Sequence, residues 1–154
     1  GSFDNGNGEV TDIISAYNYL TTIQSINLDK IGVAGYSFGA SITLDLFIKI
    51  QTNNIKTNLQ SFAFIACPSS NIERLLPTDI YTNINFTNQI LSSNKLFIYG
   101  DSDELIDQNV YSHLLRNLCK PSDITIINNS DHFFSSGITQ LSNKIGDFFN
   151  STLK

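Results

Sequence analysis

The 154-residue sequence predicts an α/β fold with a mainly parallel sheet and helices on both faces. Short apolar runs of strand length alternate along the chain with longer segments of helical spacing. Several of these runs are almost continuously apolar, as is typical of parallel strands that are covered on both faces. The length predicts a single domain, residues 1–154, that is large enough to bury a substantial core.

The first half of the chain contains two of the expected strands. Residues 1–8 are rich in Gly, Asn and Asp and predict a loop. From Glu9 the apolar residues have helical spacing, and acidic residues in the first turn suit the helix dipole. Residues 30–34 and 61–66 are the expected strands, and residues 41–51 between them are a helix. The apolar faces of these two helices carry Val10, Ile13, Ile14, Tyr17 and Leu20, and Ile42, Leu46, Phe47 and Ile50, respectively.

The second half contains two further strands, at residues 95–99 and 124–127. Between residues 68 and 94 the pattern is least regular, with a short helix expected at 72–76. Two longer helices are expected: one begins at an Asp107 N-cap and ends at Leu118, and one covers residues 138–149. Their inward residues are expected to be Val110, Leu114, Leu115 and Leu118, and Leu141, Ile145, Phe148 and Phe149.

The first strand runs into Gly35-Tyr36-Ser37-Phe38-Gly39, a Gly-x-Ser-x-Gly pattern that is followed by a helix. This strand, turn and helix context is typical of a nucleophile elbow, which presents a serine hydroxyl clear of the sheet. We expect the two glycines to let strand and helix approach closely. The helix dipole and the Phe38 N–H would then face the space above Ser37, as one donor of an oxyanion hole. A glycine-rich turn without catalysis is the alternative interpretation.

Acidic residues and a histidine follow later strands, at the same edge of a parallel sheet. The chain order Ser37, Asp103, His132 is that of a nucleophile, acid and base triad. We expect Asp103 to be the acid because it lies three residues beyond Gly100, which ends the third strand. Asp101 is the next candidate, and is expected instead to cap the turn through its own backbone.

The other reactive side chains have less evidence for a role. Glu104 and Asp131 are interpreted as solvated acids, and His113 as an exposed helix residue. Cys67 follows the second strand and could line a pocket, but no group beside it would activate it as a nucleophile. Cys67 and Cys119 lack metal-ligand spacing and are expected to be free thiols, with a disulfide as the alternative. With only two histidines, a histidine-rich metal site is excluded, so no metal site is expected. The serine hydrolase hypothesis below implies no cofactor.

Three segments together resemble a bacterial family of predicted α/β hydrolases that is similar to dienelactone-hydrolase-like esterases. These are Gly35-Tyr36-Ser37-Phe38-Gly39-Ala40, Tyr99-Gly100-Asp101-Ser102-Asp103 and Asp131-His132-Phe133-Phe134. The opening residues 1–9 resemble the segment that leads to the first helix in that family. The resemblance covers the whole chain and implies Ser37 as nucleophile, Asp103 as acid and His132 as base.

The sequence also departs from that family. Family members carry earlier strands and a loop that supplies a second oxyanion N–H, and neither precedes residue 1 here. We therefore expect the C-terminal part of a hydrolase, without the N-terminal strands. Strand 30–34 would then have an unpaired edge that could pair with the missing part or with a second copy.

The leading hypothesis is a serine hydrolase that cleaves a small carboxylic ester or thioester. A fragment that binds a partner or a small molecule without turnover, and a peptidase of the same fold, are the alternatives. Tyr81, Ile84 and Phe86 are the candidate substrate contacts. The net charge of −5 and the lack of a basic cluster argue against nucleic acid or an anionic membrane as partner. No apolar run has the length of a membrane span and no signal peptide is evident, so the cytoplasm is the expected location.

Overall fold

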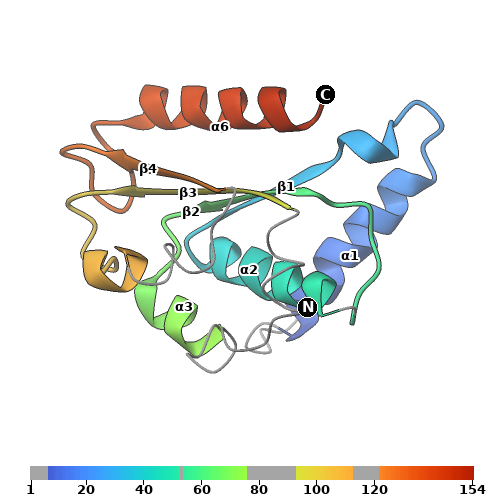
Figure 1. The fold of residues 1–154 in the computed structure, drawn as a ribbon, viewed down its shortest axis with the longest axis horizontal. Coiled ribbons are helices and arrows are strands. Elements are labelled where there is room, and N and C mark those ends of the chain that lie inside the picture. Colours follow the sequence, from blue (N-terminus) through green and yellow to red (C-terminus); the bar gives the residue numbers. More distant parts are fainter. Residues whose placement is uncertain (1–6, 53, 76–92, 113–121) are drawn as a thin grey trace.

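A computed structural model describes residues 7–52, 54–75, 93–112 and 122–154 of the chain. Four parallel strands form one sheet in the order β1-β2-β3-β4, with β1 at one edge of the described sheet. Helix α6 covers one face of this sheet, and helices α1, α2 and α3 lie on the other (Figure 1). The predicted α/β fold with a parallel sheet and helices on both faces is confirmed.

The strands are β1 (Gly32–Tyr36), β2 (Ser61–Ile65), β3 (Asn94–Gly100) and β4 (Ser122–Ile127). The longer helices are α1 (Asn7–Thr21), α2 (Phe38–Gln51) and α6 (Ile138–Thr152), and α3 (Ser69–Leu75) is shorter. Residues 108–112 are also helical, and the Asp107 side chain accepts hydrogen bonds from the Asn109 and Val110 N–H groups at 2.8 and 3.4 Å. The expected N-cap is therefore present, while the expected end of this helix lies outside the described residues.

Most of the predicted boundaries differ from the observed ones by a few residues, and the differences at β1 and α3 bear on the site. The first strand begins at Gly32, because Leu28–Lys30 form a turn of 3₁₀ helix whose N-cap, Asn27, accepts the Asp29 N–H at 3.0 Å. This side-chain bond satisfies the backbone locally and delays the strand. Strand β1 then continues to Tyr36, beyond the expected end at residue 34. Helix α3 begins at Ser69 rather than at residue 72.

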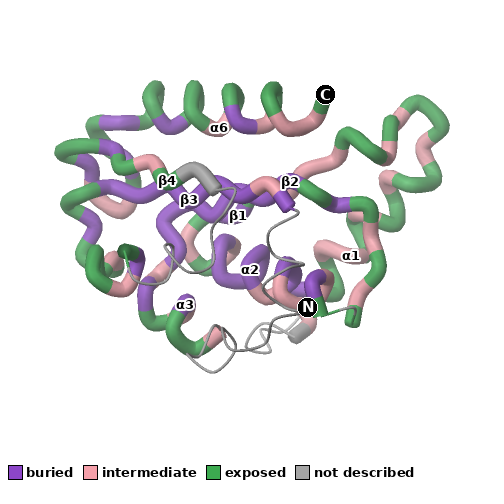
Figure 2. Tube along the Cα trace, in the orientation of Figure 1, coloured by how far each residue is buried: buried purple, intermediate pink, exposed green. Residues whose placement is uncertain are grey.

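The pleat of the central strands divides the core into two apolar clusters. Phe62 and Phe64 of β2 pack with α1 and α2, whereas Ala63 and Ile65 face α6. In β3 the same alternation places Phe97 on the α2 side. Figure 2 shows the sheet as the most buried layer, with exposed residues on the outer turns of α1 and α6.

Tight contacts also connect the layers at two glycines. A Cβ at Gly32 would lie 2.3 Å from the Phe149 ring of α6, and a Cβ at Gly35 would lie 2.2 Å from the Gly39 carbonyl oxygen of α2. Both distances are shorter than real Cβ contacts. At Gly35 the contacting atoms include the backbone of α2, so only glycine fits there, whereas a side chain at Gly32 would require the Phe149 ring to shift. A Cβ built at Gly39 has nothing within 4 Å apart from its chain neighbours and the backbone of its own helix. The expectation that both glycines of the motif permit close packing is therefore correct for Gly35 and wrong for Gly39.

Candidate active site

Strand β1 ends at Tyr36 and is followed by a sharp turn at Ser37, which is the N-cap of helix α2. Ser37 has φ 52° and ψ −118°, a left-handed backbone conformation that is uncommon for a residue other than glycine. Its N–H donates to the carbonyl of Ile65 at 2.8 Å, so the turn remains attached to the end of β2. The strained turn of a nucleophile elbow, predicted from the Gly-x-Ser-x-Gly pattern, is thus present.

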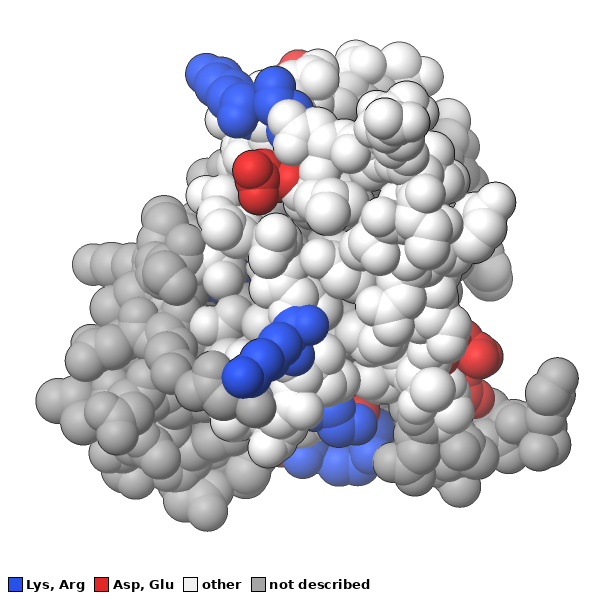
Figure 3. Space-filling view, turned by 90° about the vertical axis from the view of Figure 1, so that its right-hand side faces the viewer, with Lys and Arg blue, Asp and Glu red and all other residues white. Residues whose placement is uncertain are grey.

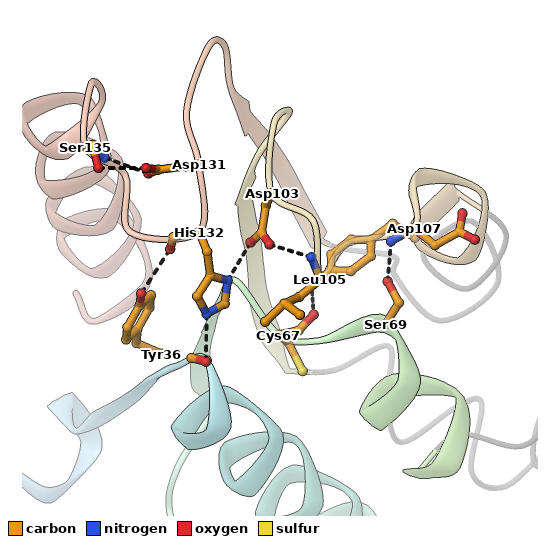
Figure 4. Close-up of polar contacts among 11 residues, drawn as sticks. Tyr36, Cys67, Ser69, Asp103, Leu105, Asp107, Asp131, His132 and Ser135 are labelled. Carbon is orange, nitrogen blue, oxygen red and sulfur yellow. Dashed lines mark hydrogen bonds and ion pairs between the residues drawn. The ribbon is translucent and has the colours of Figure 1, made fainter.

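His132 lies on the loop between β4 and α6. Its ring lies between Ser37, which follows β1, and Asp103, which follows β3 (Figure 4). Its Nε2 lies 2.8 Å from Ser37 Oγ, and its Nδ1 lies 2.7 Å from Asp103 Oδ2. An acidic partner at Nδ1 favours the tautomer in which Nδ1 donates to the carboxylate and Nε2 accepts from the serine hydroxyl. The structure therefore brings together the three residues that the sequence grouped.

Asp103 is held in a turn that excludes water from its side chain. The carboxylate is fully buried, whereas the His132 side chain remains 15% exposed. The second carboxylate oxygen, Oδ1, accepts the Leu105 N–H at 2.9 Å. The same turn is attached to α3, because Ser69 N–H donates to the Leu105 carbonyl at 3.1 Å and Ser69 Oγ accepts the Asp107 N–H at 2.7 Å. A buried carboxylate with both oxygens occupied can hold an imidazole in one orientation.

The Asp101 carboxylate has a different role from the one predicted. Instead of capping its own turn, Oδ1 accepts the Ser130 N–H at 3.4 Å and the Ser102 hydroxyl at 3.0 Å. The Ser102 N–H donates in return to the Ser130 carbonyl at 3.0 Å. A Cβ at Gly100 would lie 2.1 Å from that same carbonyl. Asp101 therefore connects the turn that carries Asp103 to the loop that carries His132.

Asp131 is bound within the histidine loop rather than simply solvated. Its two oxygens accept the Ser135 N–H at 2.9 Å and the Ser135 hydroxyl at 2.8 Å. These bonds lower the pKa of the Asp131 carboxyl below its ordinary value. They brace the loop between His132 and the start of α6. Glu104 is exposed, in agreement with its interpretation as a solvated acid.

Cys67 is fully buried, so the prediction that it lines a pocket is wrong. Its thiol is free, lies 3.7 Å from Ser41 Oγ, and has a pKa raised by burial to about 12. The Cys67 carbonyl accepts the hydroxyl of Tyr111 at 2.6 Å, a buried contact that no sequence pattern indicated. A buried neutral thiol is a poor nucleophile, which leaves Cys67 a packing role.

The remaining predicted residues have no described place in the site. Tyr81, Ile84, Phe86, His113 and Cys119 lie outside the described residues. Among the residues that are described, no group of three His, Cys, Asp or Glu side chains could hold a metal ion. Within the same residues, no helix has both the length and the apolar character that crossing a membrane requires. On the face shown in Figure 3, uncharged side chains predominate and the Lys and Arg side chains lie in separate places.

Comparisons with known proteins identify relatives of this chain and of its fold. The chain is 27% identical to an uncharacterized protein of Rickettsia prowazekii over 96% of its own length and 58% of that protein. A protein of unknown function from Agrobacterium tumefaciens superimposes with a TM-score of 0.74 at 23% identity, over 99% of this chain and 64% of the other. For the dienelactone hydrolase of Anabaena variabilis the TM-score is 0.63 at 19% identity, over 94% and 60% of the two chains.

The chain thus spans about three fifths of the length of these relatives. The structural likenesses confirm the α/β-hydrolase fold that the sequence motifs implied. A model of the family described as serine hydrolase (FSH1) matches residues 2–140, which include all three residues that meet at His132. The chain therefore belongs to the serine hydrolase (FSH1) family.

Proposed function

We propose that this chain carries the nucleophile, base and acid of a hydrolase that cleaves a small carboxylic ester or thioester through an acyl-Ser37 intermediate. The observation that carries the proposal is the pair of contacts at His132, 2.8 Å to Ser37 Oγ and 2.7 Å to Asp103 Oδ2. A serine hydroxyl is a weak nucleophile unless a base within hydrogen-bond distance takes its proton. His132 is at that distance.

The reaction has two stages. Ser37 Oγ attacks the substrate carbonyl carbon while its proton passes to His132 Nε2, and the carboxylate of Asp103 stabilises the imidazolium. The tetrahedral intermediate collapses as His132 protonates the leaving alkoxide or thiolate, which leaves the acyl group on Ser37. Water then attacks the acyl group with His132 again as base, and a carboxylic acid is released. No step needs a cofactor.

The oxyanion of the tetrahedral intermediate would lie at the start of α2. Phe38 is the first residue of this helix and follows Ser37 directly, so its N–H lies at the positive end of the helix dipole. We propose this N–H as one oxyanion donor.

Exposed apolar side chains flank the site and favour a neutral substrate. Phe38 follows the nucleophile, Leu105 follows the acid by two residues, and Phe133 follows the base. Their exposed fractions are 43%, 51% and 74%, which is high for large apolar residues. An uncharged ester therefore fits this surface better than an ionised substrate does. The contacts predicted for Tyr81, Ile84 and Phe86 stay a prediction.

Labelling with a fluorophosphonate probe tests the proposal, because the probe needs an activated serine but accepts many site shapes. Intact mass should show one adduct on the folded chain, peptide mapping should place it at Ser37, and Ser37→Ala should abolish it. Ser41→Ala is a matched control, since Ser41 is a buried serine on α2. An absence of labelling on a chain shown to be folded would contradict the proposal.

The edge of β1 supports a second proposal, about partners. In the described sheet β1 pairs with β2 alone, and Ala34 and Tyr36 are exposed. An unpaired strand edge presents backbone N–H and C=O groups to another strand. We propose that this edge pairs with a strand from a further segment of the protein or from a second copy. Light scattering on the purified chain tests the second form: a dimer supports pairing between copies, and a monomer at high concentration excludes it.

A further inference from the structure

The side chain of Tyr36 occupies a specific position between the nucleophile and the base. Tyr36 is the last residue of β1 and directly precedes Ser37. The pleat places it on the same face as Gly32, and a Cβ at Gly32 would meet Phe149 of α6. Gly35 faces α2 on the other side of the sheet. Tyr36 therefore points toward the α6 side, where the loop that carries His132 crosses the strand ends.

Two contacts connect Tyr36 with His132 (Figure 4). The phenol hydroxyl donates to the His132 backbone carbonyl at 3.0 Å. The two rings lie 5.5 Å apart, centroid to centroid, with an interplanar angle of 34°. Tyr36 is 43% exposed, so burial of its ring does not by itself explain this arrangement. The hydroxyl contact restrains the backbone of His132, and the ring contact restrains its side chain.

The histidine loop is attached on its other side to the acid turn. The Ser102 N–H donates to the Ser130 carbonyl at 3.0 Å, and Asp101 accepts the Ser130 N–H. These bonds set the distance between Asp103 and His132. They do not set the distance from His132 to Ser37, which lies on a different strand end. The Tyr36 hydroxyl spans that second gap from the residue next to the nucleophile.

We propose that Tyr36 is a positioning residue that fixes His132 relative to Ser37, a role that rests on the proposed hydrolase function. Tyr36 and Ser37 share one peptide bond, so any displacement of the turn at Ser37 also moves Tyr36. The hydrogen bond from the Tyr36 hydroxyl to the His132 carbonyl then moves His132 in the same direction. The gap between Nε2 and Oγ is thereby kept near 2.8 Å. Small losses of alignment between a nucleophile and its base reduce the rate strongly.

The protonation state of Tyr36 suits this role. Partial burial, together with the negative charges of Asp103 and Asp131, raises the pKa of the Tyr36 phenol above its ordinary value. The hydroxyl consequently stays protonated, and remains a donor, in the neutral pH range in which an ester would be cleaved.

Tyr36→Phe removes the hydroxyl and keeps the ring. We expect the rate of fluorophosphonate labelling at Ser37 to fall roughly 3- to 10-fold, the size expected for one lost hydrogen bond. Tyr19→Phe is the matched control, because Tyr19 is 67% exposed on α1. It should leave the labelling rate unchanged. Thermal unfolding should be nearly the same for both variants and the parent chain.

Proton NMR gives a measurement that does not depend on activity. The Nδ1–H of His132, bound to Asp103, should give a downfield resonance that His132→Gln removes. We expect Tyr36→Phe to broaden or shift this resonance and Tyr19→Phe to leave it in place. A role limited to stability would lower the unfolding temperature without moving the resonance.

The outcomes separate the two proposals. An unlabelled parent chain with an intact resonance that Tyr36→Phe disturbs would contradict the hydrolase function and support the positioning of His132. A labelled parent chain with the same rate and the same resonance in Tyr36→Phe would overturn the positioning role alone. Equal effects of Tyr36→Phe and Tyr19→Phe would also overturn it.

Discussion

Replacement of Asp103 by Asn tests the proposed mechanism most sharply. The two carboxylate oxygens of Asp103 have different partners: Oδ1 accepts the Leu105 N–H at 2.9 Å, and Oδ2 faces His132 Nδ1 at 2.7 Å. In Asp103→Asn the Leu105 N–H still requires an acceptor, so the amide oxygen takes the Oδ1 position. The amide NH₂ group then takes the Oδ2 position and faces His132.

This arrangement changes the tautomer of His132. An NH₂ donor opposite Nδ1 requires Nδ1 to accept, and the ring proton moves to Nε2. Nε2 then cannot take the proton of Ser37. The equivalent change of tautomer in a Ser-His-Asp hydrolase lowers turnover by about 10⁴-fold, or about 5.5 kcal/mol in the barrier. We expect a loss of this order in the fluorophosphonate labelling rate and in the hydrolysis of an activated ester.

Asp101→Asn is the matched control on the same turn. Its amide oxygen can still accept the Ser130 N–H, so we expect only a small change in rate. Circular dichroism should show that both variants are folded. The reasoning would be refuted if folded Asp103→Asn kept a labelling rate within tenfold of the parent chain, or if Asp101→Asn lost as much as Asp103→Asn.

Three further predictions concern packing and protonation. Gly35→Ala should lower the free energy of unfolding, measured by denaturant titration, by about 1–3 kcal/mol because the new Cβ meets the backbone of α2. Gly39→Ala should be tolerated because a Cβ there has open space. Equal effects of the two substitutions would contradict the packing argument. Cys67 should resist alkylation in the folded chain, and since its pKa is raised to about 12, stability measured by thermal melts should fall as pH rises above 9. The lowered pKa of Asp131 stabilises the folded chain above the ordinary value of 3.8, and this contribution is lost as pH falls through the lowered value. Ser135→Ala removes one of the hydrogen bonds to Asp131, so the stability of this variant should depend less on pH in the acid range. Identical profiles of stability against pH for the variant and the parent chain would contradict this prediction.

The alternation of elements and the grouping of Ser37, Asp103 and His132 could be predicted from the sequence. Both depend on local patterns: near-continuous apolar runs predict buried parallel strands, and reactive residues that follow such strands share one edge of the sheet. The start of β1 could not be predicted as reliably. The Asn27 side chain binds a backbone N–H that would otherwise be free for the strand. The apolar pattern of residues 30–34 does not indicate this competing hydrogen bond.

The sequence by itself therefore determined the fold class, the nucleophile turn and the order of the reacting residues, because strand burial and turn chemistry act over a few neighbouring positions. Only the tertiary structure decided which side chains support them. Tyr36 lies 96 residues from the carbonyl that it binds, and Asp101 lies 29 residues from Ser130. Contacts at such separations depend on how the strand ends are brought side by side. Tyr36 occupies the first of the two variable positions of the Gly-x-Ser-x-Gly motif. There the sequence indicates a side chain but not the direction in which it points.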